Sequence, residues 1–344
     1  MKKLALFAGL LLVLTPVGSV SAQSAKKHTI EALTKSLANP YFLRMKQGYD
    51  YAQKKLQVEL VFASTPGGET DQKLGQPLLP ADVEQLNILQ SWVTEGSLEG
   101  LIVTPFRPAS LNSALATVSR KDVPIINIDE IIPEEVANAY GIKIVTRIAS
   151  NNVEVGNLDA QLVLKLVSKG SDVAVIEGDP VTTSSMDRVK GFTDAAKEGG
   201  LKVAASQPAN WDRKKARELA TKMLTDYPNL KAIFAANDDM ALGVVNAVQA
   251  AGASGKVLVV GVDATPDALE AVKQGLLAGT VAQYPDAMAY VAVETMIKKL
   301  NGETVPEKID SPIKLITKSN LSDARKVLPR RVEQLNIVRA DPLR

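Results

Sequence analysis

The chain contains no cysteine and only one histidine, His28, among its 344 residues. Without cysteine there is no disulfide bond, no thiolate metal ligand and no cysteine nucleophile. A Ser-His-Asp triad would have to use His28, which stands near the start of the chain, and a zinc site normally needs several His or Cys ligands. We therefore expect no catalytic residues, no metal and no cofactor.

The chain also lacks an excess of charge of either sign. It has 40 Lys and Arg against 38 Asp and Glu. Without Lys2 and Lys3, which stand within the first 22 residues, there are 38 residues of each sign. This balance gives no reason to expect nucleic acid or an anionic membrane as a partner. Aromatic residues are scarce as well, at 4% of the chain.

The first 22 residues have the pattern of a secretory signal peptide. Met-Lys-Lys at 1–3 is basic, residues 4–17 are apolar, and Val-Ser-Ala at 20–22 are small residues ahead of Gln23. The apolar run is short for a spanning helix, and no stop-transfer pattern follows it. We expect the mature protein to work outside the cytoplasm. Retention of the run as an uncleaved anchor is the less favoured alternative.

In the remaining 322 residues, short β-branched apolar runs alternate with longer amphipathic stretches. The apolar runs are continuous, which is typical of strands buried on both faces of a parallel sheet. Strands are expected at 28–35, 57–63, 100–103, 124–128, 144–148, 172–177, 202–205, 232–235, 257–262 and 279–282. Helices are expected at 41–55, 81–94, 110–120, 153–168, 184–198, 213–227, 239–251, 265–274 and 286–301. The alternation predicts two α/β domains with helices on both faces of each sheet.

Three segments depart from this alternation. Residues 65–80 are rich in Gly, Pro and polar residues, and 131–141 contain Pro133 and an acidic pair, so both are expected to be loops. Each follows a strand end, where open α/β sheets bind ligands, so each could be a lid or simply a surface insertion. Residues 322–344 form a basic tail, expected to be a surface extension.

Polar and aromatic residues gather just past the predicted strands, where the ligand crevice of such a sheet lies. Seven motifs of this kind stand at 36–42, 127–129, 184–192, 208–212, 235–243, 260–267 and 282–286. Their order and spacing resemble the ribose-binding family of periplasmic sugar-binding proteins that feed ABC transporters. The likeness runs from about residue 29 to 317, nearly the whole mature chain.

The resemblance implies an α/β fold of the type I periplasmic binding protein class, with two Rossmann-like lobes whose parallel sheets are flanked by helices. The lobes would be 27–150 plus 284–310 and 151–283 plus 311–321, after the signal peptide 1–22 and before the tail 322–344. A three-segment hinge would join them at 150–152, around Gln283 and around Asp310. The same resemblance implies a periplasmic location.

Matching motif to motif gives a set of ligand-binding candidates. They are Asn39, Tyr41, Phe42 and Asp129 from the first lobe, and Arg188, Trp211, Asn237, Asp263 and Gln283 from the second lobe and the hinge. A sugar presents hydroxyls at its rim and C–H groups on its faces, so flat rings with polar groups around them suit it. Each ring could instead plug a loop against its own lobe.

Two candidates also have local structural explanations. Asn237 could cap a helix, although we expect it to bind ligand while Asp238 or Asp239 serves the helix. Asp263 could be a turn former before Thr265-Pro266, although ligand contact is favoured.

Two positions depart from the family pattern. Thr104 stands where the family has an asparagine, and Glu130 replaces the arginine that usually follows the first-lobe aspartate. If Glu130 points inward, the pocket holds three carboxylates against Arg188 and favours a polyol or an amino sugar. If it points outward, as we expect by a narrow margin, it is a solvated loop charge and the pocket suits a neutral sugar.

The primary hypothesis is therefore a monomeric solute-binding protein that captures a monosaccharide or polyol by hinge closure and delivers it to the permease of an ABC transporter. A second hypothesis keeps the same ligand step but docks the closed form on a chemoreceptor or a sensor kinase. A third, less favoured, is a carbohydrate-active enzyme using Asp129 and Asp263 as paired carboxylates. Nucleic acid is expected in none of them.

Overall fold

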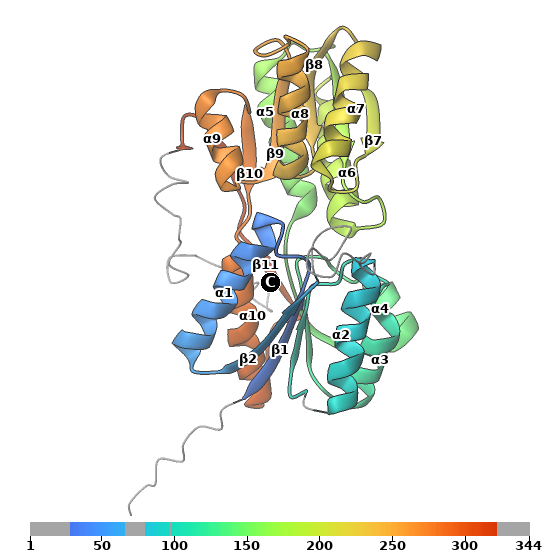
Figure 1. Cartoon of the computed structure of the whole chain (residues 1–344), viewed down its shortest axis with the longest axis vertical. Helices are drawn as coiled ribbons and strands as arrows, with labels where there is room; N and C mark the ends of the chain where they lie inside the picture. The colour runs from blue at the N-terminus through green and yellow to red at the C-terminus, as the bar shows by residue number, and fades with distance from the viewer. Residues whose placement is uncertain (1–27, 66–79, 97, 322–344) are drawn as a thin grey trace, which may run out of the picture.

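The computed structural model describes residues 28–65, 80–96 and 98–321, which form two α/β lobes stacked end to end (Figure 1). The predicted signal peptide, nearly all of the segment 65–80 and the basic tail lie outside the described residues. Each lobe contains one six-stranded sheet with helices on both faces.

The sheet of the first lobe has the strand order β11-β5-β4-β3-β1-β2, and every pairing in it is parallel. Its strands are β1 (Thr29–Thr34), β2 (Glu59–Ser64), β3 (Leu101–Val103), β4 (Ile125–Ile128), β5 (Ile144–Ser150) and β11 (Lys308–Ser311). The central strands β3 and β4 are buried along their whole length, which explains their unbroken apolar sequence.

The sheet of the second lobe has the order β12-β10-β9-β8-β6-β7. Its strands are β6 (Asp172–Glu177), β7 (Lys202–Pro208), β8 (Leu230–Ala235), β9 (Leu258–Asp263), β10 (Gly279–Ala282) and β12 (Lys314–Thr317). Pairing is parallel except at the edge, where β12 runs antiparallel to β10.

Helices cover both faces of each sheet. In the first lobe, α1 (Pro40–Leu56) packs on α10 (Pro285–Leu300), and α2 (Ala81–Glu95), α3 (Asn112–Arg120) and α4 (Glu134–Tyr140) lie on the opposite face. In the second lobe, α5 (Asn152–Leu166) packs on α6 (Thr183–Glu198), α7 (Arg213–Asp226) packs on α8 (Asp238–Ala250), and α9 (Pro266–Gln274) lies beside α8.

The apolar interiors of the two lobes are separate except at the start of α10, where Tyr284 and Ala287 join the cluster of the second lobe. One apolar cluster fills the second lobe and includes the stacked rings of Phe192 and Phe234, whose centroids are 4.5 Å apart. Two further clusters lie in the first lobe. Because each lobe buries its own apolar side chains, either can keep its packing while the other changes orientation.

Over its described residues, the chain crosses between the lobes three times. It passes from β5 to α5 at 150–152, from β10 to α10 at 282–285, and from β11 to β12 at 311–314. These crossings lie next to the positions at which the sequence analysis drew the lobe boundaries. The parallel strands of both sheets end in this region, so their carboxyl ends face each other (Figure 1).

Two expectations were wrong in detail. Residues 134–140 form helix α4 rather than a loop, with Pro133 at the N-cap and Glu134 and Glu135 in the first turn. A proline and an acidic pair are helix-start signals as well as loop signals. The strands β11 and β12 were missed because they are four-residue edge strands with exposed lysines, so they lack the continuous apolar run of the central strands.

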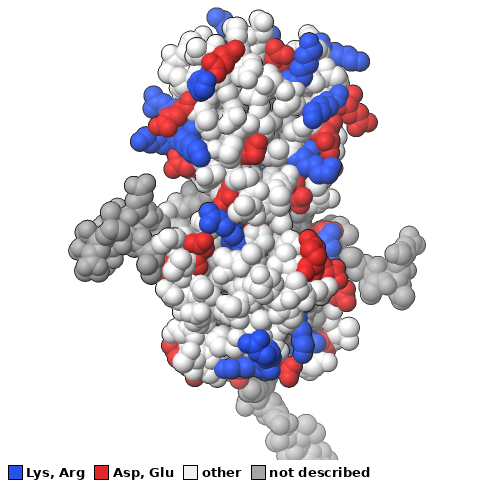
Figure 2. Space-filling model, turned by 90° about the vertical axis from the view of Figure 1, so that its right-hand side faces the viewer, with Lys and Arg blue, Asp and Glu red and all other residues white. Residues whose placement is uncertain are grey.

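Surface charge is mixed on the face drawn in Figure 2. Acidic and basic side chains are interspersed over both lobes on that face, and the molecule is narrower between the two lobes. Within the described residues, no helix is long and apolar enough to cross a membrane.

Candidate ligand-binding site

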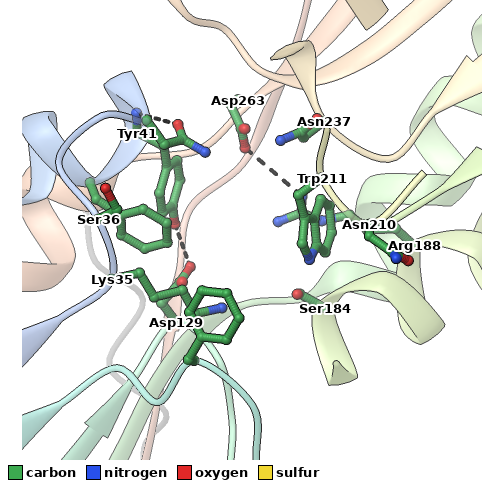
Figure 3. A pocket seen from close by; sticks show the side chains of 13 residues that line it. Lys35, Ser36, Tyr41, Asp129, Ser184, Arg188, Asn210, Trp211, Asn237 and Asp263 are labelled. Atoms are coloured by element: carbon green, nitrogen blue, oxygen red, sulfur yellow. Dashed lines mark hydrogen bonds and ion pairs between the residues drawn. The ribbon is translucent and has the colours of Figure 1, made fainter. Parts of the chain in front are cut away.

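A cavity of about 170 Å³ lies between the lobes, at the carboxyl ends of both sheets. It is large enough to hold a small organic molecule. Its walls come from both lobes (Figure 3). The lining residues are Lys35, Ser36, Asn39, Tyr41, Phe42, Phe106, Asp129, Ser184, Arg188, Asn210, Trp211, Asn237 and Asp263.

Aromatic rings form much of the wall. Tyr41 and Phe42 meet edge to face, with ring centroids 5.1 Å apart. Trp211 lies on the opposite side of the cavity, on the second lobe (Figure 3). Its ring lies against the backbone of Gly178, where an added Cβ would come within 2.3 Å of the indole. The glycine after β6 is therefore required for the position of this ring.

The backbone is strained around the cavity. Among the described residues, seven non-glycine residues have positive φ, and four of them line the cavity. These are Asp129 (φ 64°), Asn210 (φ 56°), Trp211 (φ 66°) and Asp263 (φ 116°). Such conformations cost about 1–3 kcal/mol each and persist where the surrounding structure imposes them, commonly at functional sites.

On the first lobe, Asp129 and Tyr41 form the main polar contact. The Tyr41 hydroxyl donates to Asp129 Oδ1 over 2.6 Å. Burial raises the pKa of Asp129, and the nearby ammonium of Lys35 and the tyrosine hydrogen bond oppose this rise. Burial also raises the pKa of Tyr41 well above its usual value, with a further contribution from Asp129. The tyrosine therefore remains a neutral donor, and Asp129 keeps its second oxygen as an acceptor.

On the second lobe, Asp263 is the corresponding acceptor. Gln283 Nε2 donates to its Oδ1 over 2.7 Å, and Arg188 Nη1 lies 3.9 Å from the same oxygen. Burial raises the pKa of Asp263 to about 7, although Arg188 and the Gln283 hydrogen bond both lower it. This carboxyl is therefore close to half ionised at neutral pH.

The Arg188 guanidinium is fixed by its own lobe. Its Nε donates to Asn152 Oδ1 and its Nη1 to the Ala236 carbonyl, both over 2.8 Å. Its guanidinium carbon lies 5.8 Å from the centre of the Trp211 ring. Holding the fork in this way orients the remaining N–H groups in advance, which lowers the entropic cost of binding an acceptor.

Asn39 and Asn237 each combine a helix cap with a place in the cavity wall. Asn39 Oδ1 accepts from Tyr41 N at the start of α1, and Asn237 Oδ1 accepts from Met240 N at the start of α8, both over 2.9 Å. With the oxygen engaged, the side-chain NH2 is the group available to donate to a ligand.

We expected Asp238 or Asp239, rather than Asn237, to cap the helix that begins here, and this was wrong. Asn237 is the N-cap of α8, and Asp238 instead accepts from Thr265 N and Thr280 Oγ1, both over 2.7 Å. Asp238 therefore connects the start of α8 to the start of α9 and to β10.

Eight of the predicted residues line the cavity: Asn39, Tyr41, Phe42, Asp129, Arg188, Trp211, Asn237 and Asp263. Thr104 and Gln283 do not. Thr104 is buried in the first lobe, where its carbonyl accepts from Gln85 Nε2 and its hydroxyl faces Met45 Sδ. Gln283 contacts the Asp263 carboxylate instead, donating a hydrogen bond to it from Nε2.

Glu130 lies outside the cavity wall too, and the expectation that it points to solvent was wrong. Its side chain is 0% exposed and its carboxylate bonds to the start of α6. Asn127 fixes the loop that aims it there, donating from Nδ2 to the Glu130 carbonyl and accepting from Ile132 N. The pocket is thus lined by two carboxylates, Asp129 and Asp263, rather than three.

Sequence reasoning missed five lining residues, Lys35, Ser36, Phe106, Ser184 and Asn210. Ser36, Ser184 and Asn210 stand inside the polar motifs already noted past the strands, so position alone could have included them. Lys35 directly follows β1, and Phe106 follows Thr104 by two residues. Lys35 Nζ lies 5.7 and 5.9 Å from the ring centres of Phe42 and Phe106.

The arrangement can hold a small polar molecule between flat rings and fixed hydrogen-bonding groups. In the described part of the chain, no three His, Cys, Asp or Glu side chains are grouped as a metal ion would need. Two α/β lobes with one cavity between them define the class of two-lobed binding proteins.

Comparisons with known proteins agree with this class. A family model for the periplasmic binding protein domain matches residues 30–304. The ribose import binding protein RbsB of Escherichia coli (strain K12) is 33% identical over 300 residues, which are 87% of this chain and 94% of that protein. The D-allose-binding periplasmic protein of the same strain is 34% identical over 292 residues, 84% of this chain and 89% of that protein.

Among solved structures, an ABC transporter periplasmic solute binding protein from Actinobacillus succinogenes 130z with bound D-allose superposes with a TM-score of 0.78 at 30% identity. The match covers 86% of this chain and 100% of that one. This chain belongs to the periplasmic binding protein family.

Proposed function

We propose that this protein captures a monosaccharide or a polyol between its two lobes and delivers it to the permease of an ABC importer. The observation that carries the proposal is the lining of the cavity: aromatic rings from both lobes together with two carboxylates, a fixed arginine and three asparagine side chains. The ribose and D-allose named for its relatives, and the D-allose bound in the solved structure, support this ligand class.

The residue types fit hydroxylated ligands. Asp129 and Asp263 accept from hydroxyl donors, and Arg188 and the amides of Asn39 and Asn237 donate to hydroxyl or ring oxygens. The rings of Tyr41, Phe42, Phe106 and Trp211 cover the C–H faces of a pyranose or cyclitol. A ligand that lacks a matching hydroxyl leaves a buried polar partner unpaired, so the site selects by hydroxyl position.

Binding is coupled to closure of the lobes. Only an arrangement with the lobes together offers both walls, so a ligand that touches both favours that arrangement. The crossings at 150–152, 282–285 and 311–314 act as the hinge. The proposed cycle contains no covalent step. Export by the signal peptide at 1–22 places the mature protein, starting at Gln23, in the periplasm.

A thermal-shift screen of the protein from Gln23 onward tests the proposal, using pentoses, hexoses, polyols and amino sugars as probes. A ligand at about 100 times its Kd adds about 2.7 kcal/mol to the unfolding free energy and raises Tm by several degrees. We expect such a shift with at least one neutral sugar or polyol. Trp211→Ala should abolish the shift, while Tyr140→Ala, an exposed aromatic on α4, should keep it. A response to amino acids or anions alone would reject the ligand class.

A further inference from the structure

Glu130 occupies an unusual position between the lobes. It follows Asp129, which has a positive φ of 64°, in the loop after β4. Asp129 lines the cavity and Glu130 does not, so the two adjacent carboxylates serve different surroundings. Glu130 belongs to the first lobe and is fully buried, yet most of its partners belong to the second.

Both carboxylate oxygens of Glu130 reach the first turn of α6. Oε1 accepts from the backbone N and the Oγ1 of Thr183, each over 2.6 Å, and from Ser184 N over 3.4 Å. Oε2 accepts from Ser184 Oγ over 2.6 Å and faces Lys35 Nζ at 3.5 Å. This is a nearly complete set of partners for a buried carboxylate.

Helix α6 lacks the cap that would otherwise fill this place. Its N-cap residue, Thr182, makes no side-chain bond to the helix, and its hydroxyl instead donates to the Asp179 carbonyl. The first turn of α6 contains no acidic residue. Two of the N–H groups at the start of this helix, and its positive end, are therefore satisfied by a carboxylate from the opposite lobe.

We propose that Glu130 is a positioning residue that clasps the two lobes together in the arrangement that forms the cavity. It also orients two cavity groups. Ser184 gives its only hydroxyl hydrogen to Glu130, so toward the cavity its oxygen can only accept a hydrogen bond. Lys35, on the facing wall, is held beside the same carboxylate. The orientation of these two groups toward a sugar depends on the proposed sugar-binding function. The contact of Glu130 with the second lobe does not depend on it.

A second contact between the lobes provides a matched control. Arg107 of the first lobe pairs with Asp179 of the second over 2.9 Å, but the Arg107 side chain is 44% exposed. Exposed ion pairs stabilise little, whereas a buried carboxylate bonded to a helix start is much stronger. Removing Arg107 should therefore change lobe closure far less than removing the charge of Glu130.

The distance between the lobes tests the clasp without any ligand. The chain has no native cysteine, so Glu135→Cys on α4 and Lys214→Cys on α7 provide two exposed sites for spin labels. Double electron–electron resonance on the sugar-free protein should show longer distances between the two labels in Glu130→Gln and in Thr183→Val. Thr183 itself does not line the cavity. Arg107→Gln should match the wild type. Identical distributions in all four proteins, with or without a lower Tm, would overturn the proposal.

Ligand affinity provides the second readout. With the clasp removed, a smaller fraction of molecules is closed, so the apparent Kd for a sugar found in the screen should rise about tenfold or more in Glu130→Gln and Thr183→Val. Unchanged affinity in both would overturn the role of Glu130 in binding. If no sugar binds even the wild type, the proposed function fails, while the label distances still decide the clasp.

Discussion

Sugar affinity should fall as pH falls below neutrality, because the ionised carboxylate of Asp263 is a stronger acceptor for a ligand hydroxyl than the protonated carboxyl. Burial raises the pKa of this carboxyl from an ordinary value of 3.8 to about 7. A protonated carboxyl has one oxygen that carries hydrogen, and it loses much of its attraction to Arg188. Lowering the pH therefore replaces the binding form of the site by a form that binds weakly.

The magnitude follows from linkage. If the ligand binds only the ionised form, the apparent Kd at pH 6 is about tenfold above its value at pH 8, and at pH 5 about a hundredfold. Binding at pH 6 then releases about 0.9 proton per ligand, and at pH 8 about 0.1. Burial raises the pKa of Asp129 as well, so its protonation acts in the same direction.

Isothermal titration calorimetry between pH 5 and pH 8, in buffers of different ionisation enthalpy, measures both the affinity and the protons released. Asp263→Asn is the matched control: it keeps an acceptor oxygen for Gln283 but cannot titrate, so its weaker binding should vary much less with pH. A wild-type Kd that changes less than twofold between pH 8 and pH 6, with no proton release, would refute the reasoning.

Two further predictions concern single residues. Gly178→Ala should weaken sugar binding about tenfold, because the new Cβ would lie only 2.3 Å from the Trp211 ring and would displace it. Altered tryptophan fluorescence with unchanged far-ultraviolet circular dichroism would support this displacement. An unchanged Kd would contradict it. Glu31 is 1% exposed and burial raises its pKa to about 7, so its ionisation destabilises the fold as pH rises from about 4.5 toward 7. Glu31→Gln should raise the unfolding free energy by roughly 3 kcal/mol at pH 8 and by about 1 kcal/mol at pH 5, and equal effects in urea denaturation at both pH values would count against it.

Much of the fold could be predicted because its signals are local. Each central strand is a continuous apolar run, and the helices between them have amphipathic patterns, so βα alternation is visible without knowing which strands pair. The edge strands β11 and β12 lack this signal, because short segments with exposed lysines have the same sequence pattern as surface loops. Their place in the sheets depends on pairing with β5 and β10, far away in the sequence.

The cavity wall was partly predictable for a similar reason. Parallel strands end at one edge of a sheet, so polar residues just past them gather there. That rule finds Asp129, Asp263 and Asn237. It cannot distinguish a side chain that enters the cavity from one that turns behind it, such as Gln283. The difference depends on backbone dihedrals, which the residue type does not determine.

Glu130 shows where sequence reasoning stops. The alternatives drawn from the sequence were the cavity and the solvent, because those are the surroundings that a loop after a strand normally has. The structure adds a third, the start of a helix in the other lobe, 53 residues further along the chain at Thr183. A contact across the hinge exists only when both lobes are placed, so it depends on closure and not on local pattern. For the same reason, the residues that set the closure equilibrium need not be those that touch the ligand.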